Sequence, residues 1–357
     1  MKIKKSRRAI FFTPFLLLVF VLGNMSPAQI KFLPEAFAYL YYEEADTLRI
    51  SSSGASDFWL ETPRNIGGEI RIQTWEKNEL LVKYEKKSKA NTKREAREFI
   101  ELIELDLDKT EDVIILEVSS PRHAPWEGSD KSARLSLHIF IPEDFNLRTE
   151  TIYFDYDISG PLNNVEIENG YGKIYVEGVA GETDIQTSYG GVEARDLSGR
   201  VNIETSYGSI FLSNVDTQDK TAFLKTAYDK IDMRKIRGDI KARTNYSPIN
   251  GTDLELSGGT SSFETIYSKV DLKIKEIKDC DLFIENTHGN VHLGLPRDVS
   301  AGVSLSIDPG GRIETAGLSI LVESIDQTSL KGVLGEGESN IEVDVGGIGK
   351  ILLESYE

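Results

Sequence analysis

The chain has 357 residues, 39% of them apolar, which is enough for a substantial buried core in one large domain or two smaller ones. It holds 58 acidic and 41 basic residues, a formal net charge of −17. This balance argues against nucleic acid as a partner, because binding phosphates requires clustered lysine and arginine. An acidic surface favours solubility and can also attract divalent cations.

The first 38 residues have the layout of a secretory signal. A basic head, "MKIKKSRR", precedes an apolar run over residues 9–23, and small and polar residues follow. The small-residue rule allows cleavage after Ala28 or after Ala38, of which we prefer Ala38. The alternative is an uncleaved membrane anchor, but the apolar run falls short of the required length of about 20 residues and contains Pro14. We therefore expect an exported protein with a signal peptide at residues 1–38.

Removal of that segment takes away six basic residues and one acidic residue, which leaves 35 basic and 57 acidic residues. Cys280 is the only cysteine and lies far from the signal. The sequence therefore offers neither a lipid-attachment cysteine at a cleavage site nor an intramolecular disulfide. Stability after export must come from packing and hydrogen bonds.

Residues 39–160 are expected to form a β-rich part with a short helix and a loop insert. The segment "GGEIRIQTWEKNELLVKYEKK" (67–87) alternates like a strand and is similar to a degenerate copy of the repeat described below. A capping-box pattern from Thr92 to Glu95 predicts a short helix that runs into a strand from Ile100.

Two further segments connect this part to the rest of the chain. "SSPRHAPWEGSDKSA" (119–133) has the composition of a loop and contains Trp126. Residues 135–160 have strand alternation and lead directly into a tandem repeat.

The repeat dominates the second half of the chain. "DIQTSYGGV" (184–192) returns as "NIETSYGSI" (202–210). With the aromatic residue as anchor, successive copies are 18, 18, 21, 18, 21 and 21 residues apart. The anchors are Tyr171, Tyr189, Tyr207, Tyr228, Tyr246, Tyr267 and His288. Seven copies at such spacing predict a repeat architecture.

Each copy has the pattern of two short strands joined by a turn. Apolar residues alternate with polar ones on both sides of the anchor. Gly or Asp follows most anchors, and both residues tolerate the positive φ of a tight turn or bulge. The position two residues before the anchor falls on the otherwise apolar side of the strand, yet it always holds a polar residue. We therefore expect this residue to hydrogen-bond the stacked backbone. Its residues are Asn169, Thr187, Thr205, Thr226, Thr244, Thr265 and Asn286.

A unit of about 20 residues with two strands cannot bury its own apolar side, whereas stacked units share a continuous core. The sequence therefore predicts an all-β fold, with a β-solenoid of stacked 18–21-residue coils over residues 161–357 and equivalent residues about 4.8 Å apart. Residues 316–340 are Gly-rich and irregular. The strand pair in "NIEVDVGGIGKILLES" (340–355) is expected to close the stack as a capping coil, because open ends need caps.

These units, with "GGEIRIQTWEKNELLV" upstream and "HGNVHLGLPRDVSAGVSLSIDPGGRI" near the end, resemble the DUF4097 family of adhesin-like bacterial envelope proteins. The family is similar in pattern to the head domains of autotransporter adhesins. The resemblance covers residues 47–352 and implies a right-handed β-helix-like fold in the cell envelope. It brings no catalytic residues with it. This chain departs from most relatives by placing Tyr, rather than a small residue, at the anchor.

No catalytic motif is present in the sequence, and neither a cofactor nor a metal is expected. The only histidines are His123, His138, His288 and His292. A metal site at His288 and His292 lacks a third ligand at a suitable spacing. The competing interpretation is structural: His288 replaces Tyr at the anchor, and His292 lies on the polar side of its strand.

Solenoids also host enzymes that cleave polysaccharides, which need paired carboxylates or a carboxylate-bound metal on one face. Candidates here are Asp155, Asp157, Asp184 and Asp232. Asp and Glu are also the ordinary residues of solvent-facing strand positions. We therefore expect a non-enzymatic protein, with a carbohydrate-active β-helix protein as the alternative.

The anchor tyrosines are the strongest candidate for a binding site. Stacked along one edge, six phenols would suit sugar rings or another protein. The alternative is packing, with the rings over the corner of each coil and the hydroxyls at the rim, since these positions share parity with inward residues. The candidate residues are Tyr171, Tyr189, Tyr207, Tyr228, Tyr246 and Tyr267. The expected function is an adhesin-like scaffold or binding surface in the periplasm or at the cell surface, with an envelope glycan or another surface protein as partner.

Overall fold

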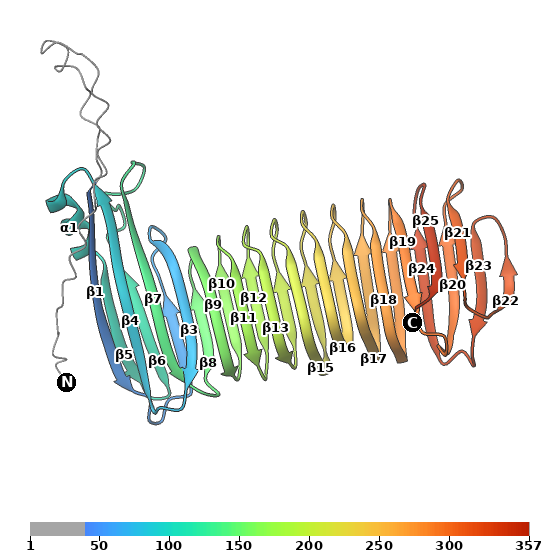
Figure 1. Ribbon diagram of the computed structural model, residues 1–357, viewed down its shortest axis with the longest axis horizontal. Helices are drawn as coiled ribbons and strands as arrows, with labels where there is room; N and C mark the ends of the chain where they lie inside the picture. The colour runs from blue at the N-terminus through green and yellow to red at the C-terminus, as the bar shows by residue number, and fades with distance from the viewer. Residues whose placement is uncertain (1–39, 357) are drawn as a thin grey trace, which may run out of the picture.

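The computed structural model describes residues 40–356, and these form one long, open, almost entirely β structure (Figure 1). The predicted signal peptide at residues 1–38 and both cleavage points lie outside the described residues. Within residues 40–356 there are twenty-five strands and one short helix, so the all-β prediction is confirmed. No helix in this range is long and apolar enough to cross a membrane.

The middle of the molecule is a stack of parallel strands. Its strands are β10 (Val165–Asn169), β11 (Ile174–Val179), β12 (Thr183–Thr187), β13 (Val192–Ser198), β14 (Val201–Glu204), β15 (Ile210–Lys225), β16 (Ile231–Arg243), β17 (Ile249–Thr265), β18 (Val270–Asn286) and β19 (Asn290–Leu295). Each strand pairs in parallel with the equivalent strand of the next copy. Val165 lies beside Thr183, and Ile210 lies beside Ile231. We call each copy a rung. Every rung has a strand segment before its anchor and one after it, and each of β15 to β18 joins the segment after one anchor to the segment before the next.

Alternation places the apolar side chains of both strands inside the stack. In β12 the side chains of Thr183, Ile185 and Thr187 are buried, while those between them are exposed or half-buried. The same pattern in every rung produces one continuous core of Ile, Leu and Val that runs the length of the molecule. The core is therefore a product of stacking.

A second structural feature recurs seven residues after the anchor in five successive rungs, and the sequence pattern does not predict it. The parallel pairing of the strands after the anchor skips this residue, and the residue has positive φ in five successive rungs. These residues are Gly178, Asp196, Asn214, Lys235 and Asp253. A β-bulge explains both observations, because one extra residue leaves the ladder and bends the strand. Gly, Asn and Asp tolerate this conformation, but Lys235 shows that the stack can impose it on other residues.

The N-terminal end contains a rung that is out of chain order. The elements there are β1 (Leu40–Ser51), β2 (Asp57–Glu61), β3 (Gly67–Trp75), β4 (Glu79–Ala90), α1 (Lys93–Glu101), β5 (Glu104–Thr110), β6 (Val113–Ser119), β7 (Ser132–Pro142), β8 (Asn146–Glu150) and β9 (Tyr153–Leu162). β2 lies in parallel between β6 and β8, and β3 lies in parallel between β7 and β9. The chain first forms this rung, then forms the outer strands β4 to β7, and finally forms β8 and β9 on the inner side of the rung.

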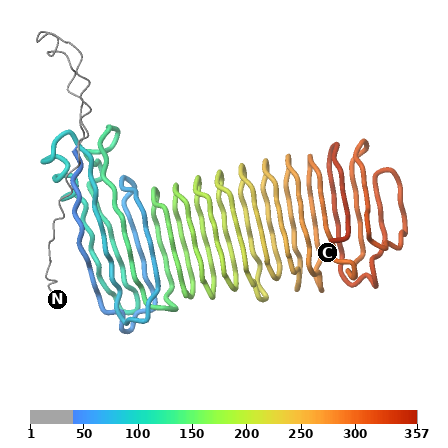
Figure 2. Tube along the Cα trace, in the orientation of Figure 1, coloured from blue at the N-terminus to red at the C-terminus, as the bar shows by residue number. Residues whose placement is uncertain are grey.

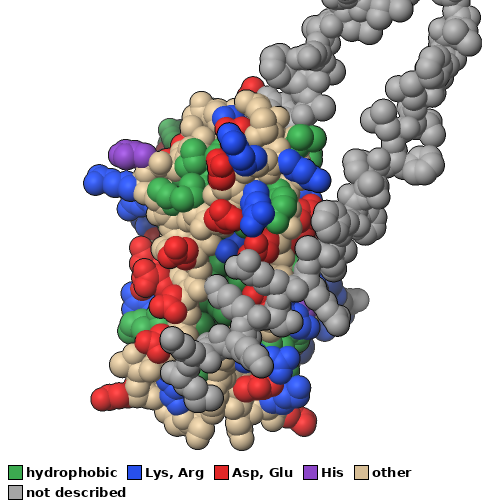
Figure 3. Space-filling view, turned by 90° about the vertical axis from the view of Figure 1, so that its left-hand side faces the viewer, with side chains coloured by type: hydrophobic (Ala, Val, Ile, Leu, Met, Phe, Trp, Pro, Cys, Tyr) green, Lys and Arg blue, Asp and Glu red, His purple; other side chains and the backbone are tan. Residues whose placement is uncertain are grey.

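Antiparallel strands and the helix close this end. β4 lies between β1 and β7, and β5 pairs with β6. The helix packs on β1 and β4 through Ala96, Phe99 and Ile100, which are buried. On the surface of this end, basic and acidic side chains are interspersed (Figure 3).

The predicted capping box is present at the start of α1. The backbone N–H of Glu95 donates to Thr92 Oγ1 at 3.1 Å, and Glu95 Oε2 accepts from the N–H of Asn91 at 3.1 Å. The strand expected from Ile100 begins at Glu104 instead, because Phe99 and Ile100 still point into the core as helical residues.

The residues around Trp126 form a loop, as predicted, but the indole ring is buried. Its Nε1 donates to the carbonyl of Asn65 at 2.8 Å, and its ring centroid lies 5.5 Å from that of Phe99. Trp126 therefore anchors the loop to the core and does not offer a free aromatic surface.

The C-terminal end also contains a rung that is out of chain order. Its strands are β20 (Ala301–Ile307), β21 (Arg312–Ala316), β22 (Ile320–Ile325), β23 (Ser329–Leu334), β24 (Ser339–Val345) and β25 (Lys350–Ser355). β24 lies between β18 and β20, and β25 lies between β19 and β21 (Figure 2). The predicted closing strand pair is present, but it lies inside the stack. The segment expected to be irregular contains an antiparallel hairpin, β22 and β23, which pairs with β20 through β23.

β22 is an edge strand with exposed apolar side chains. It pairs with β23, and Leu321, Val322 and Ile325 are 73%, 45% and 68% exposed. The edge strand at the other end, β1, carries the charged residues Glu43, Glu44, Asp46 and Arg49, which are a usual protection against pairing with another chain. The two ends of the stack thus differ in their surface chemistry.

Candidate functional site

The anchor residues form one unbroken stack of rings along an edge of the molecule. Neighbouring ring centroids are 4.6 to 5.4 Å apart, and neighbouring ring planes differ by 3° to 21°. We call its seven phenols the tyrosine ladder: Tyr153, Tyr171, Tyr189, Tyr207, Tyr228, Tyr246 and Tyr267. The ring of His288 stacks on Tyr267 and ends the series.

Tyr153 is a member that the sequence analysis missed. Phe154 follows it, so it lacks the Gly or other turn residue that marks the later anchors. Two signals could have found it: it lies 18 residues before Tyr171, and Thr151 occupies the polar position two before it.

Backbone hydrogen bonds set the spacing of the rings. The N–H of Tyr189 donates to the carbonyl of Gly170 at 3.0 Å, and the N–H of Tyr207 donates to that of Ser188 at 3.0 Å. The same bond recurs from rung to rung. Because parallel strands stack about 4.8 Å apart, rings on equivalent residues must meet face to face.

The buried polar residues two before each anchor hold the turns together, as predicted. Thr205 Oγ1 donates to the carbonyl of Gly190 at 3.2 Å and accepts from the N–H of Gly208 at 3.1 Å. Thr226 Oγ1 donates to the carbonyl of Gly208 at 3.0 Å. Each hydroxyl thus links its own rung to the preceding one. A buried backbone group left without such a partner costs about 1–3 kcal/mol.

Glycine occupies the positions after the anchors for two different reasons. Gly172 has a φ of 109°, which agrees with the predicted positive φ. Gly190 and Gly208 do not have positive φ, so the prediction was wrong for them. Their reason is close approach of the stacked backbone, since a Cβ on Gly208 would lie 1.8 Å from the carbonyl oxygen of Gly190.

The rings are stacked and also exposed. The ladder tyrosines are between 42% and 57% exposed, although their parity in the sequence predicts an inward direction. The turn resets the alternation, so parity before the anchor does not extend to it. Partial burial, followed by the nearby phenols of Tyr189 and Tyr153, raises the pKa of Tyr171.

Stacking decides which part of each ring a ligand can reach. The two faces of an interior ring are covered by its neighbours, so the exposed part is the ring edge with its hydroxyl. A sugar that packs on an aromatic ring uses the ring face. The interior of the ladder therefore offers hydrogen bonds and edge contacts in place of face stacking.

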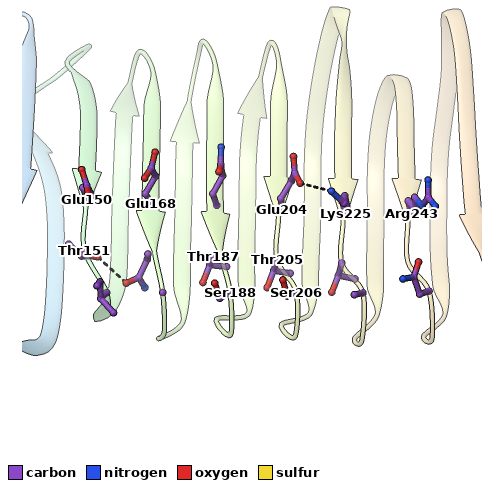
Figure 4. Close-up of a pocket in the computed structure, with 17 residues that line it drawn as sticks. Glu150, Thr151, Glu168, Thr187, Ser188, Glu204, Thr205, Ser206, Lys225 and Arg243 are labelled. Atoms are coloured by element: carbon purple, nitrogen blue, oxygen red, sulfur yellow. Dashed lines mark hydrogen bonds and ion pairs between the residues drawn. The ribbon is translucent and has the colours of Figure 1, made fainter. Parts of the chain in front are cut away.

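A groove of about 580 Å³ runs beside the ladder across six rungs (Figure 4). The residues directly before the anchors line it and are mostly small: Ile152, Gly170, Ser188, Ser206, Ala227 and Asn245. The residues three before the anchors also line it and carry its charge: Glu150, Glu168, Gln186, Glu204, Lys225 and Arg243. The groove is therefore acidic at its N-terminal end and basic at its C-terminal end. Glu204 Oε2 and Lys225 Nζ meet at 3.0 Å where the sign changes.

A second groove, of about 900 Å³, follows the stacked bulges. Four of its charged residues, Asp216, Arg237, Glu255 and Lys275, are paired with one another. Arg237 lies 2.7 Å from Glu255, and Lys275 lies 2.6 Å from the same carboxylate. The hydrogen bonds from Lys275 and Arg237 hold the pKa of Glu255 below its usual range.

The four acidic candidates do not form one cluster. Asp157 pairs with Arg71 at 3.0 Å, and Asp232 pairs with Lys230 at 2.6 Å. Asp184 accepts from Asn202 at 3.2 Å on a strand before the anchor, whereas Asp155, Asp157 and Asp232 lie on strands after it. Asp155 accepts from the backbone N–H of Lys173 at 2.7 Å, so each of the four carboxylates already has a partner.

The histidines are also separated. His288 lies in the ring stack, while His292 lies between Asp271, at 3.1 Å, and Glu354, at 2.8 Å. Within residues 40–356 there is no group of three or more His, Cys, Asp or Glu side chains that could hold a metal ion. Cys280 is buried, and this burial raises the pKa of its thiol.

These features define an all-β protein built from stacked rungs, with an aromatic ladder and a groove along one edge. No family model and no curated protein matches the chain, so the resemblance to DUF4097 stays a prediction.

Two solved structures show a weak likeness. One is a "putative cell adhesion protein" from Clostridium sporogenes, with 13% identity over 88% of this chain and 100% of that chain, at a TM-score of 0.21. The other is a "putative adhesin" from Bacteroides fragilis, with 10% identity over 87% of this chain and 96% of that chain, at a TM-score of 0.25. These TM-scores are too low for either likeness to carry a conclusion about this chain.

Proposed function

We propose that the protein is a non-enzymatic, exported, adhesin-like binding surface of the bacterial cell envelope, and that the tyrosine ladder with its adjoining groove is the binding site. The observation that carries the proposal is the exposure of seven stacked tyrosines in a single row. Exposed aromatic surface of this extent is typical of interaction sites and is uncommon on a surface that contacts only water.

The proposed architecture is a right-handed β-solenoid with coils of 18–21 residues. The coil length is supported by the parallel register, in which Val192 lies beside Ile210 and Ile249 lies beside Val270. Handedness comes from the family resemblance. Such a stack is a rigid rod, because each rung bonds to its neighbours along two strands.

The proposed location is the periplasm or the cell surface. Support comes from the basic head and apolar run at the N-terminus. The proposed partners are an envelope glycan or another surface protein. Either would meet the hydroxyls and ring edges of the ladder and the charged residues of the groove.

The second candidate function is a carbohydrate-active enzyme, for which a general acid with a raised pKa is the requirement. Several carboxyls in the structure have a displaced pKa in the opposite direction. Hydrogen bonds from basic partners lower the pKa of Glu255 and Glu314, and turn hydrogen bonds lower that of Asp326. These three carboxyls therefore do not meet the requirement for a general acid.

The test uses two variants at one position. Tyr207→Ala removes an interior ring, and Tyr207→Phe keeps the stack but removes the hydroxyl. We expect binding on arrays of envelope glycans, or capture of surface proteins, to fall about tenfold with Tyr207→Ala, a change of about 1.4 kcal/mol. A comparable fall with Tyr207→Phe would assign recognition to the hydroxyl row.

The control is Phe283→Ala, because Phe283 is 39% exposed and lies outside the ladder. If Tyr207→Ala binds every probe as well as the parent chain does, and melts at the same temperature, the ladder is neither a binding site nor a packing element. Cleavage of any array glycan by the parent chain would favour the enzyme.

A further inference from the structure

The groove beside the tyrosine ladder has the dimensions of a site for an extended chain. Its volume of about 580 Å³ lies within the usual range of ligand sites, about 300–1,000 Å³. It crosses six rungs, and five intervals of about 4.8 Å give it a length of about 24 Å (Figure 4). A compact ligand would occupy only part of this length, so the shape favours a linear polymer that lies along the stack.

The floor of the groove is open and repeats from rung to rung. In four successive rungs the residue directly before the anchor is Gly170, Ser188, Ser206 and Ala227, so no bulky side chain blocks the path there. Ser188 and Ser206 are exposed, and their hydroxyls make no hydrogen bond with any of the described residues. Each of these serines directly precedes an exposed ladder tyrosine in the chain. Neighbouring rungs therefore offer the same polar groups at the same interval.

The interval between rungs distinguishes a glycan from an extended peptide. Side chains on one side of an extended peptide recur at every second residue, about 6.6 Å apart, which is out of step with rungs about 4.8 Å apart. One residue of an extended glycan spans nearly the length of one rung, so successive sugars meet successive rungs. The faces of the interior rings are covered by their neighbours, so recognition relies on hydrogen bonds between hydroxyls.

The two cations that line the groove are neutralised within the chain. Lys225 pairs with Glu204 at 3.0 Å, and Arg243 pairs with Glu264 at 3.4 Å. Each cation brings its own carboxylate. The basic end of the groove therefore has no net positive charge with which to attract phosphate, sulfate or carboxylate groups.

The acidic end of the groove keeps its charge. Glu150 and Glu168 lie side by side on neighbouring strands and make no ion pair with any described residue. The same row continues outward, with Glu61 beside Glu150 and Glu117 beside Glu61. Four carboxylates in register repel an anionic polymer, most strongly at low ionic strength. The groove therefore selects against acidic ligands.

We propose that the ligand of the tyrosine ladder and its groove is a linear glycan without acidic groups, bound lengthwise with one sugar residue at each rung. This proposal rests on the proposed function, because it names the ligand class of the same site. The subsites resemble one another and are joined through one ligand, so affinity rises with the number of sugars until the groove is full.

The first test is isothermal titration calorimetry of the purified full chain. The probes are linear β-1,4-linked oligosaccharides of glucose, of mannose and of N-acetylglucosamine, each two to six residues long. At least one series should bind, its hexamer about tenfold more tightly than its dimer. The hexamer of that series with its C6 groups oxidised to carboxylates should bind about tenfold more weakly than the unoxidised one. The proposal is overturned if no series binds, if dimer and hexamer bind equally, or if the oxidised hexamer binds as well.

The second test blocks the floor of the groove. Ser206→Leu places a bulky side chain at an exposed position and should weaken binding of the hexamer about tenfold. The matched control is Ser213→Leu, which lies on β15 after its anchor, outside the lining of both grooves. Ser188→Leu repeats the test one rung away if Ser206→Leu lowers the melting temperature. Equal binding by the two groove variants and the control variant contradicts a ligand in this groove.

The third test concerns charge selection. The double variant Glu150→Gln with Glu168→Gln removes the two carboxylates of the acidic end. It should bind the oxidised hexamer about tenfold more tightly than the parent chain does, with the unoxidised hexamer changed less than about twofold. An unchanged affinity for the oxidised hexamer would show that these carboxylates do not select the ligand.

The outcomes separate this proposal from the proposed function. If no glycan binds but the chain captures a surface protein and loses it with Tyr207→Ala, the ligand class is wrong and the proposed binding surface stands. If no glycan binds and no protein is captured, both are wrong.

Discussion

The middle of the stack and its two ends are built from the same strands but are connected in different ways. In the middle, each strand bonds to the chain 18 or 21 residues away, as Val165 does with Thr183. At the ends the partners are much farther apart in sequence. Gly67 lies beside Tyr153, and Asp281 lies beside Asn340. The middle is therefore assembled from local contacts, and each end is locked by a rung that the chain inserts from a distance.

This difference shows how the stack avoids fraying. In a simple linear array the last rung has one neighbour and can peel away alone. Here the rung of β24 and β25 is bonded on both sides, so the outer strands β20 and β21 are attached to an interior rung that belongs to a later part of the chain. The N-terminal end uses the same arrangement with β2 and β3. The ends are thereby coupled to the body of the rod.

The largest expected effect breaks this coupling. Deletion of residues 339–357 removes the inserted rung, so β20 and β21 lose their parallel partners while the middle rungs keep theirs. Hydrogen exchange followed by mass spectrometry should show β20 to β23 exchanging near the rate of unfolded chain, with the strands of residues 165–270 still protected. Full protection of β20 to β23 in the deletion variant would show that the outer strands fold without the inserted rung.

Much of the middle could be predicted from the sequence, because each rung repeats the same residue pattern. The spacing of the anchors gave the register, and the polar residue two before each anchor gave the hydrogen bonds that link turns, as at Thr205. The ends could not be predicted in the same way. No pattern in the residues of β24 identifies β18 and β20 as its neighbours, because this pairing depends on the order in which distant strands come together.

The candidate site was predicted in part. The six tyrosines named from the repeat do lie in one row, but their exposure and the presence of Tyr153 were not predicted. The alternation of side chains predicts whether a residue points inward only within a strand, and the anchor tyrosines lie in turns. The charged groove was missed for a different reason. Its charge depends on residues three before each anchor, such as Glu168 and Arg243, whose sign changes along the stack and therefore does not show as a repeat.

The second prediction concerns close packing within the middle rungs. Gly208→Ala places a Cβ 1.8 Å from the carbonyl oxygen of Gly190, whereas the nearest atom to a Cβ on Gly191 is 3.4 Å away. We expect Gly208→Ala to lower the free energy of unfolding by about 3 kcal/mol, because the clash is with backbone that cannot move aside. Gly191→Ala is the matched control and should change it by less than about 1 kcal/mol. Urea denaturation of both variants measures the difference, and equal stability would show that the turn has room for a side chain.

The smallest expected effect tests whether a single ion pair matters to a rod held by many rungs. Glu255 is held between Arg237 and Lys275, and its lowered pKa means that the folded state favours the carboxylate. This contribution is fully present above the usual pKa of a carboxyl and is lost as the pH falls through the lowered value in the folded state. Glu255→Gln should therefore cost about 1 kcal/mol at pH 7 and nothing in strong acid, as read from urea denaturation at both pH values. Glu264→Gln, which removes a more exposed pair with Arg243, is the control and should cost less. A loss that is the same at both pH values would assign the effect to packing, and the stability of the middle would then come from its core and backbone alone.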